Sequence, residues 1–153
     1  MNDIESIAAA IHETYRALSR EEGWTMQPHL DRPYEELAEP EKDENRAAAR
    51  RMGDVLAVAQ LALSKDPAGP AVTNDTIAAA LEPMAEAEHN GWMAHRAQAG
   101  WTWGETRDDA ARRHPSMLPY ARLSDTEKNK DRNNVRHFPD FAARAGFRIV
   151  RSE

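Results

Sequence analysis

The stretch Pro33-Tyr34-Glu35-Glu36-Leu37-Ala38-Glu39-Pro40-Glu41-Lys42 returns later in the chain as Pro119-Tyr120-Ala121-Arg122-Leu123-Ser124-Asp125-Thr126-Glu127-Lys128. Proline, tyrosine, leucine, glutamate and lysine recur at the same spacing, and each stretch is followed four residues later by an arginine. Upstream, one histidine before each stretch is followed eleven residues later by Gly-Trp-Thr. The only length difference is a loop nine residues longer in the second copy. Identities in this fixed order indicate an internal duplication.

Each copy has the pattern of two helices joined by a loop. Apolar residues three and four apart predict a first helix over residues 4–18, which Gly23 ends. A second helix is expected from about Glu41, and a third runs up to Gly100 with Pro83 in its first turn. The fourth starts near Ser124 and restarts at Pro139. Together with the abundance of alanine, this pattern predicts a mainly α fold with short extended segments.

Proline and glycine in residues 64–70 (Ser-Lys-Asp-Pro-Ala-Gly-Pro) interrupt the helical pattern and predict a linker. We therefore divide the chain into a degenerate first repeat over residues 1–65, a linker over 66–75 and a second repeat over 76–153. The two repeats are expected to form one compact domain. Gly146 is a plausible helix cap, and residues 147–150 are expected to be a short extended tail.

Composition narrows the class of protein. The chain has 153 residues, no cysteine and a formal net charge of −6. The lack of cysteine excludes disulfides and thiolate catalysis, and it fits the reducing cytoplasm, where we expect the protein to act. No apolar run approaches the roughly 20 residues that span a bilayer, and the acidic balance disfavours a nucleic-acid polymer as partner.

The second copy resembles a known family, the ryanodine receptor repeat domain, most closely its bacterial members. The resemblance covers roughly residues 84–150. It is carried by these motifs: Glu88-His89-x-x-Trp92, Gly100-Trp101-Thr102-Trp103-Gly104, Arg107-Asp108-Asp109, His114-Pro115, Leu118-Pro119-Tyr120-x-x-Leu123, Glu127-Lys128-x-x-Asp131-Arg132 and Gly146-Phe147-Arg148-Ile149. The first copy, residues 4–63, is a weaker match, because it lacks the Arg-Asp-Asp and His-Pro segments.

The resemblance implies paired repeats related by a pseudo-twofold axis. In the animal channels of this family, one such pair is associated with adenine nucleotide binding between its repeats. The histidine and the aromatic residue of the first helices line that pocket, which corresponds here to His12 and Tyr15 in the first copy and His89 and Trp92 in the second.

These four residues have two interpretations. In an arbitrary helix the aromatic residues would be core and the histidines structural donors. If the two first helices face each other, Tyr15 and Trp92 would instead sandwich a planar base, and such stacking contributes about 1–3 kcal/mol per base. The recurrence of the pair in both copies keeps the two interpretations in balance.

Other candidate ligand-binding residues carry charge or lie in the long loop. Glu88 falls on the apolar stripe and is expected to accept from a ligand or to pair with an arginine such as Arg132. Arg107 is suited to a phosphate, and Trp103 would supply a wall of the same pocket, although local pairing with Asp108 and Asp109 is the commoner role. The last two candidates, Arg46 and Arg132, recur near the starts of the second helices. Each is expected either to bind an anion there or to pair with a nearby acid.

Several apolar residues are predicted to be core without a functional role. They follow the helix-ending glycines or lie in the repeated stretches and the last helix: Trp24, Trp101, Pro33, Pro119, Leu37, Leu123, Phe138, Phe141 and Phe147.

Catalytic motifs are missing from the sequence. It has no Gly-x-Ser-x-Gly, no Gly-rich phosphate loop and no His-Glu-x-x-His, and we predict no metal and no cofactor. The leading hypothesis is a non-enzymatic domain that senses or sequesters a nucleotide-derived ligand, of the adenine nucleotide or cyclic nucleotide class, between its repeats. The alternatives are a protein–protein interaction module and an enzyme that degrades a nucleotide signal. A homo-oligomer is left open.

Overall fold

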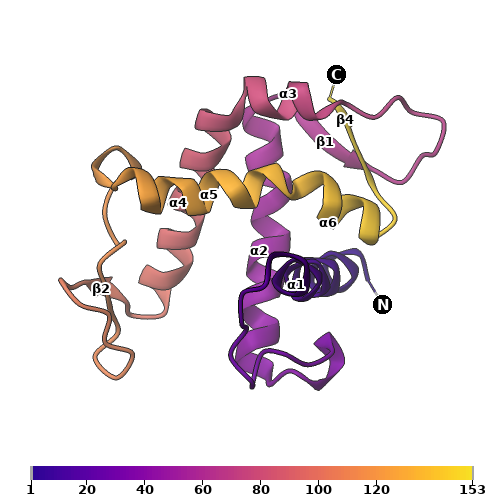
Figure 1. The fold of residues 1–153 in the computed structure, drawn as a ribbon. Helices are drawn as coiled ribbons and strands as arrows, with labels where there is room; N and C mark the ends of the chain where they lie inside the picture. Colours follow the sequence, from indigo (N-terminus) through magenta and orange to yellow (C-terminus); the bar gives the residue numbers. More distant parts are fainter. Residues whose placement is uncertain (1, 153) are drawn as a thin grey trace. The chain divides into compact units, whose positions relative to one another are not determined.

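A computed structural model of the chain describes residues 2–152. It is mainly helical, which confirms the predicted fold class (Figure 1). The chain forms two compact units. Unit 1 contains residues up to Val72 together with those from His137 onward, and unit 2 runs from Thr73 to Arg136. Within residues 2–152, no helix combines the length and apolar character needed to cross a membrane.

Unit 1 is built on α1 (Asp3–Glu22), η1 (Tyr34–Glu36), α2 (Glu39–Val58), β1 (Leu61–Ser64), α6 (Phe138–Arg144) and β4 (Arg148–Arg151). The Asn2 side chain caps α1 by accepting the backbone N–H of Glu5 at 2.8 Å. Gly23 ends α1 with a left-handed φ of 77°, as its position in the sequence predicts. Helix α2 begins two residues earlier than expected, because Pro40 is accommodated in its first turn.

The core of unit 1 forms where α1 packs against α2 and α6. The largest fully buried side chains there are Phe138, Phe141, Met52, Leu56 and Leu61. The two phenylalanines are therefore core, as predicted. The prediction for Trp24 is wrong: 43 % of this residue is exposed, because its indole N–H donates to Glu22 Oε1 at 2.9 Å beside the helix end.

The two ends of unit 1 are joined by strand pairing. Strand β1 pairs antiparallel with β4, with Leu61 opposite Arg151 and Ser64 opposite Arg148. The extended tail after Gly146 is thus confirmed as a strand, whereas its partner β1 was not predicted. The segment after β1 is non-helical up to Thr73, and α3 begins at Asn74, so the last two residues of the predicted linker are helical. The residues from His137 onward, assigned from sequence to the second repeat, group with unit 1 in the structure.

Unit 2 contains α3 (Asn74–Ala79), α4 (Leu81–Gln98), β2 (Thr102–Trp103), β3 (Arg113–His114), η2 (Tyr120–Arg122) and α5 (Asp125–Arg136). Helix α4 has Pro83 in its first turn and is followed by Gly100 with a φ of 89°, as predicted. Its buried Ala85 packs with Tyr120 and Leu123 after the long loop. Ser124 accepts the backbone N–H of Glu127 at 3.2 Å and so caps α5, which ends at Arg136 before the helix restarts as α6.

Candidate functional site

A cavity of about 210 Å³ lies within unit 2, between α4, α5 and the end of the long loop that joins them. Its lining combines aromatic, imidazole and charged side chains: His89, Trp92, His114, Ser116, Leu123, Glu127, Lys130 and Asp131. Concave sites of this kind, with a few polar groups converging on an apolar surface, are typical of small-molecule binding. Two of the predicted site residues, His89 and Trp92, are therefore brought together here.

His89 forms the inner wall and is 2 % exposed. Its Nε2–H donates to the carbonyl oxygen of Leu118 at 2.6 Å, so Nδ1 is left to face Asp131 Oδ2 at 3.4 Å. Burial lowers the pKa of His89, but the hydrogen bonds with Asp131 and the Leu118 carbonyl outweigh it, and the pKa is raised overall. Protonated His89 donates from both ring nitrogens.

Trp92 lies one turn further along α4 and is half-buried. Its indole stacks near-parallel with the His89 ring, at 5.7 Å between centroids and 28° between planes. The His114 ring meets it edge-on at 5.0 Å, and the Arg96 guanidinium lies 5.5 Å from its centroid. These contacts hold the indole in a fixed orientation at the border of the cavity.

His114 is one of the site residues that sequence reasoning missed. It belongs to β3, and its Nδ1 accepts the backbone N–H of Ser116 at 3.0 Å, which places the ring proton on Nε2. Burial, followed by the nearby charges of Arg107 and Arg96, lowers the pKa of His114, so the ring is neutral at neutral pH. The signal was present in the His114-Pro115 pair of the resemblance, which was read only as a family motif.

The charged wall of the cavity comes from α5 and was also missed. Glu127, Lys130 and Asp131 are three and four residues apart, so they share one face of the helix. This spacing was visible in the sequence, but nothing in it indicated that this face borders the histidine of α4.

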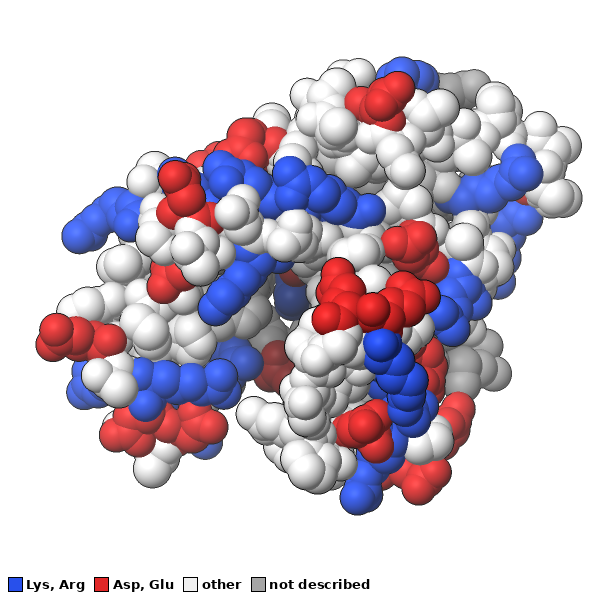
Figure 2. Space-filling view, in the orientation of Figure 1, with Lys and Arg blue, Asp and Glu red and all other residues white. Residues whose placement is uncertain are grey.

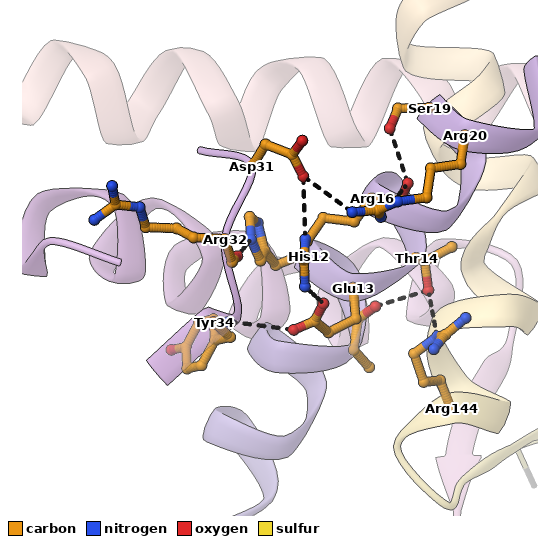
Figure 3. Close-up of polar contacts among 11 residues, drawn as sticks. His12, Glu13, Thr14, Arg16, Ser19, Arg20, Asp31, Arg32, Tyr34 and Arg144 are labelled. Atoms are coloured by element: carbon orange, nitrogen blue, oxygen red, sulfur yellow. Dashed lines mark hydrogen bonds and ion pairs between the residues drawn. The ribbon is translucent and has the colours of Figure 1, made fainter. Parts of the chain in front are cut away.

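Unit 1 contains the matching histidine in a different setting. His12 Nε2–H donates to the carbonyl oxygen of Arg32 at 2.8 Å (Figure 3). His89 makes the same bond to the carbonyl oxygen of Leu118. Tyr15, the counterpart of Trp92, packs with Phe141 at 5.7 Å between ring centroids. Asn45 stands where the second repeat has Asp131. The two copies thus share the hydrogen bond from the histidine to a backbone carbonyl. Only the second copy has an aspartate facing the other ring nitrogen.

Arg46 and Arg132 take part in a repeated structural contact. In unit 1, Arg46 pairs with Glu5, which also accepts the Tyr34 hydroxyl at 3.0 Å. In unit 2, Arg132 pairs with Glu82 at 2.7 Å, and Tyr120 donates to the same carboxylate at 3.0 Å. The guanidinium hydrogen bonds lower the pKa of both glutamates. Both arginines thus pair with a nearby acid, which is one of the two roles expected from the sequence. The other role, anion binding, stays a prediction.

The remaining candidates lie outside the cavity lining. Glu88 is buried, 3 % exposed, while the arginine suggested as its partner, Arg132, pairs with Glu82. Trp103 is 49 % exposed, and Arg107 donates to Asp109 Oδ1 at 2.8 Å, which lowers the pKa of that carboxyl. A role of Glu88, Trp103 and Arg107 in ligand binding stays a prediction. Among residues 2–152, no group of three or more histidine or acidic side chains is placed to hold a metal ion.

The region that contains this cavity matches the model of a known protein family. The family model described as the RyR domain matches residues 72–151. That segment runs from α3 to β4 and includes every residue that lines the cavity. The chain therefore belongs to the RyR domain family.

Proposed function

We propose that the chain is a non-enzymatic binding domain that senses or sequesters a small nucleotide-derived ligand, held in the cavity of unit 2. The observation that carries the proposal is the meeting of an indole, an imidazole N–H donor and charged side chains around a single space of about 210 Å³. A nucleotide offers a flat ring, hydrogen-bonding edges and a phosphate, and each of these has a partner here.

The parts of the cavity divide this recognition between them. Trp92 borders the cavity, and we propose that a planar base stacks on the part of its indole that His89, His114 and Arg96 leave uncovered. Base–aromatic stacking contributes about 1–3 kcal/mol. His114 contributes the Nε2–H donor. Lys130 is exposed on α5 at the border of the cavity, where an ammonium group attracts a phosphate.

The settings of His12 and His89, the two histidines that the enzyme alternative would use as acid or base, support binding rather than turnover. Both nitrogens of His89 face protein acceptors, the Leu118 carbonyl and Asp131. The Nε2–H of His12 likewise donates to the carbonyl oxygen of Arg32. A general acid or base must reach the proton that it transfers, and these ring nitrogens are directed at the protein.

The distribution of charge supports a small ligand rather than a polymer. Basic and acidic side chains are intermingled over the face shown in Figure 2, and the formal net charge is −6. Binding to a nucleic-acid polymer draws on an extended basic surface. We propose that the protein acts in the cytoplasm, whose reducing conditions suit a chain without cysteine.

A thermal-shift screen tests the proposal with AMP, ADP, ATP, GMP, ADP-ribose and cyclic dinucleotides. A ligand at 100 times its Kd stabilises the fold by about 2.7 kcal/mol. We expect Trp92→Ala to remove this stabilisation, while Trp103→Ala, which changes an exposed tryptophan of the same unit, keeps it. The proposal fails if no nucleotide shifts the melting temperature at millimolar concentration. Nucleotide turnover detected by chromatography would contradict its non-enzymatic part.

A further inference from the structure

We propose that the base this cavity accepts is guanine, an inference that rests on the proposed nucleotide binding and deepens it. The inference comes from three groups that border one space: the Glu127 carboxylate, the His114 Nε2–H and the Lys130 ammonium. Together they supply one carboxylate acceptor and two donors. A guanine edge is the complement of this set, with two donors beside two acceptors.

The acceptor is available. Glu127 lies in the first turn of α5, where its backbone N–H bonds to Ser124, and its half-buried side chain borders the cavity. Within residues 2–152, its carboxylate is not engaged in a salt bridge, in contrast to Asp131, which faces His89. Its charge acts on both imidazoles, since it favours the protonated forms of His89 and His114. The carboxylate is therefore near both rings and has oxygens left for a ligand.

The two donors are also available. His114 uses Nδ1 to accept from Ser116, and among the described residues its Nε2–H has no acceptor. Lys130 is exposed, and it forms no salt bridge with any residue in the range 2–152. Both groups retain hydrogen-bonding capacity for O6 and N7 of a purine, or for a phosphate in the case of Lys130.

Guanine and adenine differ in how they would meet the carboxylate. Guanine places N1–H and the 2-amino group side by side, so both oxygens of Glu127 can accept, while O6 accepts from a donor. Adenine offers its 6-amino group next to N1, whose lone pair would face the carboxylate without a proton between them. A site built around a hydrogen bond discriminates against the ligand that leaves it unpaired.

The first repeat lacks this set. Glu41 stands in the place of Glu127, but Glu44 replaces Lys130, and the shorter loop has no counterpart of His114. Only the second repeat combines the acceptor with both donors. We therefore expect one guanine nucleotide per chain.

Isothermal titration of the full chain with GMP, IMP and AMP tests the inference. IMP is GMP without the 2-amino group, so it can make only one of the two hydrogen bonds that guanine offers to Glu127. A good bidentate pair between a side chain and a base lowers the Kd about tenfold or more. We expect GMP to bind at least about tenfold more tightly than AMP, with IMP between them and a stoichiometry near one.

The variant Glu127→Gln should weaken GMP binding about tenfold. It should strengthen AMP binding, because the glutamine amide can donate to adenine N1 where the carboxylate cannot. Glu41→Gln, the same change at the matching position of the first repeat, should alter neither. If AMP binds as tightly as GMP, the guanine preference is overturned although nucleotide binding stands. If none of the three nucleotides binds, the inference fails. If the other nucleotides of the thermal-shift screen fail as well, so does the proposed function. The comparison of nucleotides on the unmodified chain decides the matter even if Glu127→Gln does not fold.

Discussion

Replacing Asp131 with asparagine should remove a stabilising contact at mildly acidic pH and have almost no effect at alkaline pH. Asparagine is the residue that the first repeat already has at this position, Asn45, so the change is compatible with the helix. Asp131 Oδ2 lies 3.4 Å from His89 Nδ1, and the other ring nitrogen donates to the Leu118 carbonyl. The carboxylate is therefore a partner of His89 only when the ring carries its second proton.

The direction of the pH dependence follows from the raised pKa of His89. A histidine whose folded pKa exceeds the unfolded value contributes its stability fully below about pH 6.5 and loses it as the pH rises through the folded pKa. Unit charges 3.4 Å apart attract by about 5 kcal/mol at an effective dielectric constant of about 20. Desolvation of the buried ring offsets part of this, and hydrogen bonds between charged groups contribute about 1.5–3 kcal/mol.

We therefore expect Asp131→Asn to lower the free energy of unfolding by about 2 kcal/mol near pH 6 and by less than about 0.5 kcal/mol near pH 9. Urea denaturation followed by tryptophan fluorescence at both pH values measures the difference. Asp54→Asn removes an exposed acid of α2 and should change stability by less than about 0.5 kcal/mol at either pH. An equal loss for Asp131→Asn at the two pH values would refute the ion pair and leave only a packing role.

Three substitutions test the scaffold by thermal and chemical denaturation. Gly53→Ala should stabilise the protein by about 0.5–1 kcal/mol, because the glycine lies inside α2 and an added Cβ meets no atom within 4 Å; a lower melting temperature would contradict this. Gly104→Ala should destabilise unit 2 by about 1–3 kcal/mol and weaken ligand binding, because its Cβ would lie 2.6 Å from that of Arg113, next to His114; unchanged stability would show that the loop adapts. Phe141→Ala should cost about 3–5 kcal/mol, since this ring is fully buried, and a loss below 1 kcal/mol would show that the core of unit 1 lies elsewhere.

The helices could be predicted because their signals are local. Gly23, Pro83, Ser124 and Pro139 mark helix ends or starts through their own backbone preferences, and the structure places helix boundaries next to each of them. Strand β1 could not be predicted in this way. Its four residues form a strand only because β4 pairs with them from the far end of the chain, and a single sequence contains no record of that pairing.

Repetition between the two copies indicated part of the candidate site, although it did not single out Glu127, which recurs as Glu41. His89 and Trp92 were found because His12 and Tyr15 occupy the same places in the first copy. His114 lies in the loop that only the second copy has, and Lys130 and Asp131 differ from their counterparts Glu44 and Asn45. A search for repeated residues discards such differences, although binding residues are often found in loops of this kind.

The antiparallel pairing of Leu61–Ser64 with Arg148–Arg151 has a consequence for the order of events during synthesis. Unit 1 is discontinuous in the chain, whereas unit 2 is a single continuous segment. On the ribosome, all of unit 2 is made before the last helix and strand of unit 1 emerge. Until then, the face of α1 that α6 later covers and the edge of β1 that β4 later pairs with remain exposed to water. Nascent chains should therefore acquire protease resistance first in the middle of the sequence and last at both ends, which makes the amino-terminal helices the part most dependent on chaperones.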